Sequence, residues 1–153
     1  MGHRPPRAPP HRRRRVGGDD MTADLGFQLG AAHRAVVAAY APVLEPHQLT
    51  HPQYLVLLVL SEATMPASVS ELAGYMSLDP ATVTPIVQKL HARGFLTKEP
   101  DSADGRRTMV QITSDGALTV RCVRRDAPTD ARVLPQSTVR MLLADLGLLV
   151  GAT

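Results

Sequence analysis

The pattern of apolar and polar positions is clearest in the middle of the chain, where it indicates two short helices in succession. Ser68 and Glu71 stand three residues apart. This is the spacing of a capping box, in which a hydroxyl and a carboxylate satisfy the free amides of a helix's first turn. The apolar residues that follow, Leu72, Ala73 and Met76, fall on one helical face. The sequence therefore predicts a short helix that opens at Ser68.

A second helix is predicted directly afterwards, over Asp79–Arg93. Asp79 is a good N-cap, and Pro80 stands at the first helical position, where its missing N–H is tolerated. Apolar residues recur at helical spacing at Val83, Ile86, Val87 and Leu90. Gly94 is a typical stop signal. Pro85 lies inside the helix and removes a backbone hydrogen bond, so we expect a kink or a late start there.

Two strands are expected next. Phe95–Lys98 and Thr108–Ile112 have the composition of strands, and Asp104-Gly105 lies in the loop between them. A helix, a turn, a second helix and a hairpin form an arrangement that suits DNA. The second helix would lie in the major groove, and the hairpin tip would reach phosphates or a minor groove. The fold class expected is mainly α with a small β-hairpin wing, a winged helix-turn-helix.

The candidate DNA-binding residues lie on the outer face of these helices and at the hairpin tip. They are Ser70, Ala81, Thr82, Thr84, Pro85, Gln88, Lys89, Arg93, Arg106 and Arg107. We expect Arg106 to enter the minor groove and Lys89 to contact a phosphate. An ordinary solvated helix face remains the alternative for the polar helix residues. For Arg106 the alternative is a solvated loop charge or a salt bridge to Asp104.

Two further helices are predicted before this module. Thr22–Ala41 carries an apolar stripe and is expected to end at Pro42 and Pro46. Thr50 and Gln53 form another capping box. The run that it opens, YLVLLVL, is apolar on all sides, and the capping box favours a central core helix over a strand.

Helices are also predicted after the module. One runs over 115–125, capped by Thr113 or Ser114, and an apolar last helix begins near residue 136. First and last helices this apolar would leave exposed surface in a monomer, so we expect a homodimer that presents two recognition helices to a palindromic site. The predicted organisation is a disordered leader at 1–20 and one domain at 21–153, with a 50–113 core and dimerisation helices at 22–48 and 114–150.

Charge is distributed unevenly along the 153 residues. The whole chain has a net charge of +3, but residues 1–20 hold six arginines and two aspartates, a net +4, which leaves −1 for residues 21–153. Any DNA-binding charge must therefore be local, and residues 89–107 carry an excess of two positive charges. The leader is either a basic arm or a translated segment upstream of a start at Met21, and we favour the second reading.

Several other classes of protein are disfavoured. A single cysteine indicates a reducing compartment, no apolar run is long enough to span a membrane, and the cytoplasm is the default location. His47 and His51 straddle the Thr50 cap, and no metal-binding motif stands out, so no metal or cofactor is expected. No catalytic array or phosphate-binding glycine loop is present, so we do not expect an enzyme.

The core resembles the MarR family (multiple-antibiotic-resistance regulators), dimeric winged-helix transcription factors. The carrying motifs are SVSELAGYMSLDPATVTPIVQKLHARGFLTK, DSADGRR and QITSDGALT. The Asp104-x-Arg106 pair matches the family's wing, and Thr113-Ser114-Asp115-Gly116 matches the start of its next helix. The resemblance covers about residues 22–126. It implies a transcriptional regulator, a repressor in the first instance; a winged-helix module that binds protein and not DNA remains the alternative.

A segment before the core is similar to the organic-hydroperoxide-sensing subgroup, namely LGFQLGAAHRAVVAAYAPVLEPHQLTHPQYLVLLVL, as is the Thr84-Pro85 pair. In that subgroup a reactive cysteine is held by two tyrosines. The resemblance places the cysteine at Gly26 and the tyrosines at Tyr40 and His51, so the sulfur and one partner are missing. Glycine has no side chain to oxidise, which excludes peroxide sensing by that route.

The signal that this chain would sense is therefore open. The family's usual pocket implies a small apolar or phenolic effector, with Phe27, Tyr40, His51 and Tyr54 as candidate lining residues. DNA binding without regulation is a second reading. A thiol sensor through Cys122 is a third, although this residue, four positions after Leu118, more simply forms part of a helix's apolar face.

Overall fold

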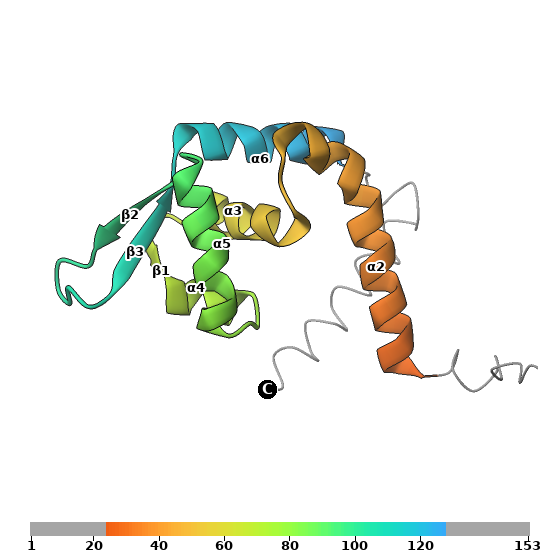
Figure 1. Cartoon of the computed structure of the whole chain (residues 1–153), viewed down its shortest axis with the longest axis horizontal. Coiled ribbons are helices and arrows are strands. Elements are labelled where there is room, and N and C mark those ends of the chain that lie inside the picture. The colour runs from red at the N-terminus through yellow and green to blue at the C-terminus, as the bar shows by residue number, and fades with distance from the viewer. Residues whose placement is uncertain (1–23, 128–153) are drawn as a thin grey trace, which may run out of the picture. The chain divides into compact units, whose positions relative to one another are not determined.

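The computed structural model describes residues 24–127 (Figure 1). The chain divides into two compact units, residues 1–36 and 37–153. The predicted leader at 1–20 and the predicted last helix lie outside the described residues. Within residues 24–127, no helix is long and apolar enough to cross a membrane.

The first helix of the described residues, α2, spans Leu25–Leu44. It opens where the Phe27 amide donates to the Asp24 carboxylate over 2.7 Å. The prediction that Pro42 ends this helix is wrong, because the helix continues through it for two more residues. Pro42 removes only one hydrogen bond near the helix end, whereas Leu44 is 2% exposed and anchors the last turn in the core. A short 3₁₀ helix follows, η1 at Glu45–His47, and the chain turns at Gln48, whose φ is +51°.

The central helix, α3, spans His51–Glu62, which confirms that the apolar run YLVLLVL is helical. The Thr50 amide donates to Gln53 Oε1 over 2.9 Å, as the capping box predicts. Val56 and Leu57 are completely buried, so this helix lies at the centre of the core. Leu72, Leu90 and Val110 bring the neighbouring helices and the sheet onto the same cluster.

The two predicted helices of the module are α4, Val69–Tyr75, and α5, Pro80–Ala92. Their caps are confirmed. The Glu71 amide donates to Ser68 Oγ over 3.2 Å, and the Ala81 amide donates to Asp79 Oδ1 over 2.7 Å. A late start of the second helix is wrong, because α5 begins at Pro80 and runs through Pro85.

Gly94 ends α5 in the way that the sequence predicts. Its φ is +75°, a conformation in which a side chain would be strained. The Gly94 amide donates to the His91 carbonyl over 2.9 Å, and the Phe95 amide donates to the Leu90 carbonyl over 3.1 Å. These two bonds form a Schellman motif, and they direct the chain straight from the helix into the sheet.

The sheet has three antiparallel strands in the order β1-β3-β2: β1 at Ala67–Ser68, β2 at Leu96–Pro100 and β3 at Thr108–Ile112. The predicted hairpin is confirmed, with Lys98 opposite Val110. The strand β1 was not predicted, because it has only two residues and its second, Ser68, also caps α4.

The last described helix, α6, spans Ser114–Asp126 and is capped by Thr113, whose hydroxyl accepts from the Gly116 amide over 3.2 Å. Leu118, four residues before Cys122 on this helix, is 49% exposed in the single chain. The buried residues of this helix are Gly116, Val120 and Val123. Glycine at position 116 allows this close packing of α6, because a Cβ there would lie 2.3 Å from the Phe95 carbonyl oxygen.

Candidate nucleic-acid interface

A polar groove of about 430 Å³ lies between the start of α4, one face of α5 and the hairpin. It gathers residues that are far apart in sequence. The predicted DNA-binding residues among those that line it are Ser70, Thr84, Gln88, Arg106 and Arg107. Lys98 of β2 also lines the groove and was missed as a site residue, although it is a basic residue on a predicted strand beside the wing.

The face of α5 toward solvent is polar, and its opposite face is buried at Val83, Val87 and Leu90. Ala81, Thr82, Pro85 and Lys89 are exposed on this helix, but they do not line the groove. The Thr84 hydroxyl donates to the Pro80 carbonyl over 2.8 Å, so its donor is used within the helix. Thr84 therefore presents a methyl group and acceptor lone pairs.

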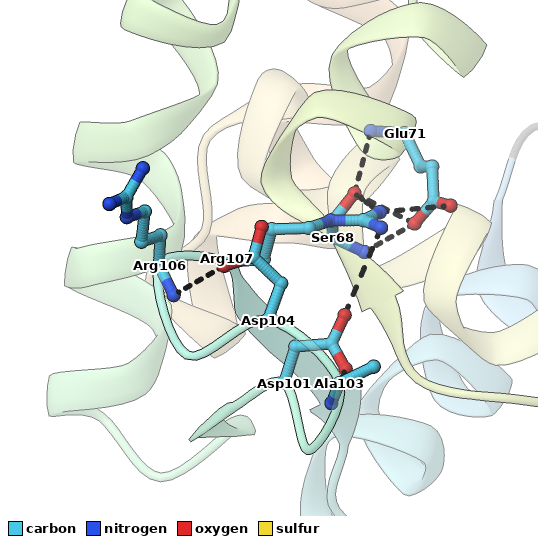
Figure 2. A network of polar contacts seen from close by, with 7 residues as sticks. All are labelled: Ser68, Glu71, Asp101, Ala103, Asp104, Arg106 and Arg107. Atoms are coloured by element: carbon cyan, nitrogen blue, oxygen red, sulfur yellow. Dashed lines mark hydrogen bonds and ion pairs between the residues drawn. The ribbon is translucent and has the colours of Figure 1, made fainter.

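The wing turn is shaped by two aspartates. Asp101 Oδ1 accepts from the Ala103 amide over 2.9 Å, and Asp104 Oδ1 accepts from the Arg106 amide over 3.0 Å. Each is an Asx turn, in which the side chain takes the place of a backbone acceptor. No ion pair within residues 24–127 involves the Arg106 guanidinium, which extends from the turn on the side away from Arg107 (Figure 2).

Arg107 is engaged with three acceptors on two elements. Its Nη2 lies 3.3 Å from Ser68 Oγ and 3.4 Å from Glu71 Oε1, and its Nη1 lies 3.8 Å from Asp101 Oδ2 (Figure 2). Glu71 Oε2 in turn accepts from the Ser68 amide over 2.7 Å. The bond from the Ser68 amide is the main reason that the pKa of Glu71 is lowered, followed by the Ser68 hydroxyl; the charge of Arg107 lowers the pKa further. We call Ser68, Glu71, Asp101 and Arg107 the Arg107 network.

Arg93 lies at the other end of α5, and the structure does not bring it to the groove. Its guanidinium donates to the Gln48 carbonyl over 2.6 Å and to the His47 carbonyl over 2.7 Å. It also lies 4.7 Å from the ring centroid of Phe95. These contacts hold the end of α5 against the segment that leads into α3 and fix the direction of the Arg93 guanidinium.

Three of the predicted effector-pocket residues lie together. The Tyr40 ring centroid lies 5.5 Å from that of His51 and 5.7 Å from that of Tyr54. Burial, and then the neighbouring Tyr40, raise the pKa of Tyr54, against a lowering influence of Arg124. A cavity of about 510 Å³ is lined by His51 and by apolar residues that include Leu44 and Leu49.

The remaining predicted positions are less informative. Phe27 lies in the first unit and is 42% exposed, and its place in a pocket stays a prediction. Gly26 lies in the first turn of α2, and Cys122 is half-buried on α6. Across residues 24–127, no group of three or more His, Cys, Asp or Glu residues could hold a metal ion.

Comparisons with known proteins agree with this geometry. A family model described as the MarR family matches residues 49–108. The transcriptional regulator TtmR of Methylorubrum extorquens is 38% identical over 104 residues, which are 66% of this chain and 53% of that protein. The organic hydroperoxide resistance transcriptional regulator of Bacillus subtilis is 34% identical over 94 residues, 61% of this chain and 63% of that protein. The chain thus spans less than two thirds of these relatives.

Solved structures share the fold. CouR of Rhodococcus jostii RHA1, bound to p-coumaroyl-CoA, has a TM-score of 0.75 at 24% identity, over 87% of this chain and 96% of that one. The repressor CouR bound to a 23-mer DNA duplex has a TM-score of 0.77 at 21% identity, over 88% and 98% of the two chains. At these identities the likeness establishes a common fold.

Proposed function

The chain belongs to the MarR family of winged-helix regulators, and on that premise we propose that it is a dimeric, sequence-specific DNA-binding regulator that acts as a repressor in the cytoplasm. One observation carries the proposal: Arg106, which has no ion pair within residues 24–127, and the polar face of α5 border the same groove. A helix for the major groove and an arginine for the minor groove are the two parts that a winged helix needs.

We assign different contacts to the exposed residues of this surface. Gln88 and Thr84 face the groove and suit base edges, since glutamine pairs with adenine and a threonine methyl packs against thymine. Lys89 and Lys98 suit phosphates, because a lysine is a point charge without directional readout. Ser70, Ala81, Thr82 and Pro85 would lie beside the backbone or the groove wall. Arg93 is the weakest member of the predicted set, because two carbonyls already occupy its guanidinium.

The dimer is supported by apolar side chains that a single chain leaves in water. Leu25 is 60% exposed, Leu29 40% and Val36 47%, all on α2, and Leu118 on α6 is 49% exposed. A second copy that covers these residues would remove the free-energy cost of exposing their apolar surface to water. Two-fold symmetry would also place two recognition helices on a palindromic operator.

The aromatic cluster supports an effector of small apolar or phenolic chemistry. Tyr40, His51 and Tyr54 offer rings with polar edges, and His51 also lines a largely apolar cavity. CouR, the structural relative solved with p-coumaroyl-CoA, binds a ligand with a phenolic group. Gly26 supplies no thiol, so the effector acts by binding and not by oxidation of that position.

The test is a binding titration against the DNA upstream of the protein's own gene, at several salt concentrations. Affinity should fall steeply with salt if phosphates are contacted. Arg106→Ala should weaken binding by more than ~1 kcal/mol, about fivefold, because the minor-groove contact is lost. Arg121→Ala is the matched control, since it removes the same charge from an exposed position on α6.

Two outcomes would contradict the proposal. Equal losses in the Arg106→Ala and Arg121→Ala variants would show a general effect of charge and remove the role of the wing. No binding to any duplex, even at low salt, would favour a winged-helix module that recognises another protein, which the near-neutral charge of residues 21–153 allows.

A further inference from the structure

Two consecutive arginines in the wing have opposite surroundings. The Arg106 side chain extends toward the side of α5, whereas the Arg107 side chain extends toward Ser68 and Glu71 at the start of α4 (Figure 2). Residues 105–107 form a turn and a bend ahead of β3, and the two arginine side chains leave this turn on different sides (Figure 2). The two arginines are adjacent in the sequence, but their side chains have different surroundings in the structure.

The backbone explains why the wing needs an additional attachment. The β1–β3 ladder ends at the pair Ser68–Met109, and Met109 lies two residues after Arg107 in the chain, so no ladder bond reaches Arg107. Within the wing, the Asp101 amide donates to the Arg107 carbonyl and the Arg107 amide donates to the Asp104 carbonyl, each over 2.9 Å. These two bonds close the turn on itself, but they do not connect it to α4. The Arg107 side chain makes that connection beyond the end of the ladder.

We propose that Arg107 is a positioning residue for DNA binding: by joining the wing to the start of α4, it fixes Arg106 in front of the groove beside α5. The inference rests on the proposed DNA-binding function. Its chemical basis is that one planar guanidinium reaches acceptors on both elements at once, Glu71 on α4 and Asp101 in the wing. Holding Arg106 in place before DNA arrives lowers the entropy lost on binding.

The network offers two substitutions that remove a charge and keep the local fold. In Glu71→Gln, glutamine at the third helical position retains the capping box with Ser68. In Asp101→Asn, asparagine retains the Asx turn that accepts from the Ala103 amide. Each variant loses an ion pair to Arg107 and little else. The third substitution, Arg107→Gln, removes the guanidinium itself.

The expected direction of the change in DNA affinity distinguishes our proposal from a simple effect of charge. Both Glu71→Gln and Asp101→Asn remove a negative charge close to an anionic ligand, so Coulomb's law alone predicts tighter DNA binding. Our proposal predicts weaker binding, by about threefold in each, the size expected for the loss of an exposed ion pair. Glu99→Gln is the matched control, since Glu99 lies on β2 beside Asp101 and has no ion pair with Arg107. It should leave affinity unchanged or slightly increased.

A second measurement needs no DNA. Hydrogen exchange of the amides of Asp101, Arg106 and Arg107 should be faster in Glu71→Gln, Asp101→Asn and Arg107→Gln than in the native protein. The amides of α5 should exchange at the native rate, which also verifies that each variant is folded. Arg107→Gln combined with Glu71→Gln should show no further change, because both remove the same contact.

The outcomes separate the two proposals. Native protein that binds no DNA, with faster wing exchange in the variants, would end the proposed function but leave the attachment of the wing standing. Native protein that binds DNA, with unchanged or tighter binding by Glu71→Gln and Asp101→Asn, would overturn the positioning role. Unchanged exchange in the wing, or an equal loss of affinity in Glu99→Gln, would also overturn it.

Discussion

Gly116 packs α6 closely against Phe95, which precedes β2, and against Ile112 of β3. A Cβ there would lie 2.3 Å from the Phe95 carbonyl oxygen and 2.8 Å from Ile112 Cγ1. The nearest atom is backbone, which gives way less readily than the end of a side chain. We therefore expect Gly116→Ala to lower the free energy of unfolding by about 1–3 kcal/mol, the usual effect of overpacking. Urea unfolding at a fixed protein concentration measures this value.

The control for this prediction is another helical glycine. At Gly74 of α4, an added Cβ would meet no other atom of the described residues within 4 Å. Gly74→Ala should raise the free energy of unfolding by about 0.5–1 kcal/mol, because alanine has less backbone freedom to lose. Destabilisation of both variants by the same amount would show that close packing at Gly116 is not the cause.

At the scale of elements, α5 combines the proposed DNA-reading surface with a residue that is unfavourable in a helix. Pro85 lies at its sixth position, is exposed, and leaves the Ala81 carbonyl without its intrahelical donor. Pro85→Ala restores that bond, so the free energy of unfolding should rise by about 1 kcal/mol or more, measured by urea unfolding. An unchanged free energy of unfolding would contradict this prediction. It would mean that proline stabilises the fold, by restricting the unfolded chain, as much as the missing hydrogen bond destabilises it.

The starts of the helices could be predicted from the sequence, whereas their ends were predicted less well. The caps at Thr50, Ser68 and Asp79 depend on side chains within three residues, so the sequence alone specifies them. The end of α2 does not: burial of Leu44 by residues far along the chain carries the helix past Pro42. The buried face of α6 was missed for the same reason, since it depends on contact with the hairpin.

The structure brings five of the ten predicted DNA-binding residues to the groove, and the sequence could not distinguish the contacts that each of them makes. Arg93, Arg106 and Arg107 look alike in the sequence, as basic residues beside a predicted reading helix. Their differences arise from tertiary contacts: Arg93 binds two carbonyls and Arg107 joins two elements, whereas Arg106 has no ion pair among the described residues. A groove formed by three elements also includes Lys98, which no local pattern singles out.

At the scale of the whole molecule, charge limits how a single subunit could bind DNA. Residues 21–153 have a net charge of −1, and two of the five bases between residues 89 and 107 already have partners within the fold. No ion pair within residues 24–127 engages Lys89, Lys98 or Arg106, so we assign these three to phosphates and the minor groove. Three cations give a modest gain from released counterions, so two subunits on one operator are needed for strong binding.

The dimer can be tested through an apolar residue that it would cover. Leu29 on α2 is 40% exposed, and a charge there would be buried without a partner in an interface. Leu29→Asp should therefore shift the mass in sedimentation equilibrium from twice 16.5 kDa toward 16.5 kDa, and weaken operator binding with it. Met65→Asp is the control, because Met65 is 75% exposed outside the predicted dimerisation helices, and this substitution should leave the mass unchanged.

A Leu29→Asp protein that remains a dimer, or a native protein that is a monomer, would exclude this face as the interface. Since DNA affinity and mass are measured on the same variant, loss of both together would tie the two-fold assembly to operator recognition.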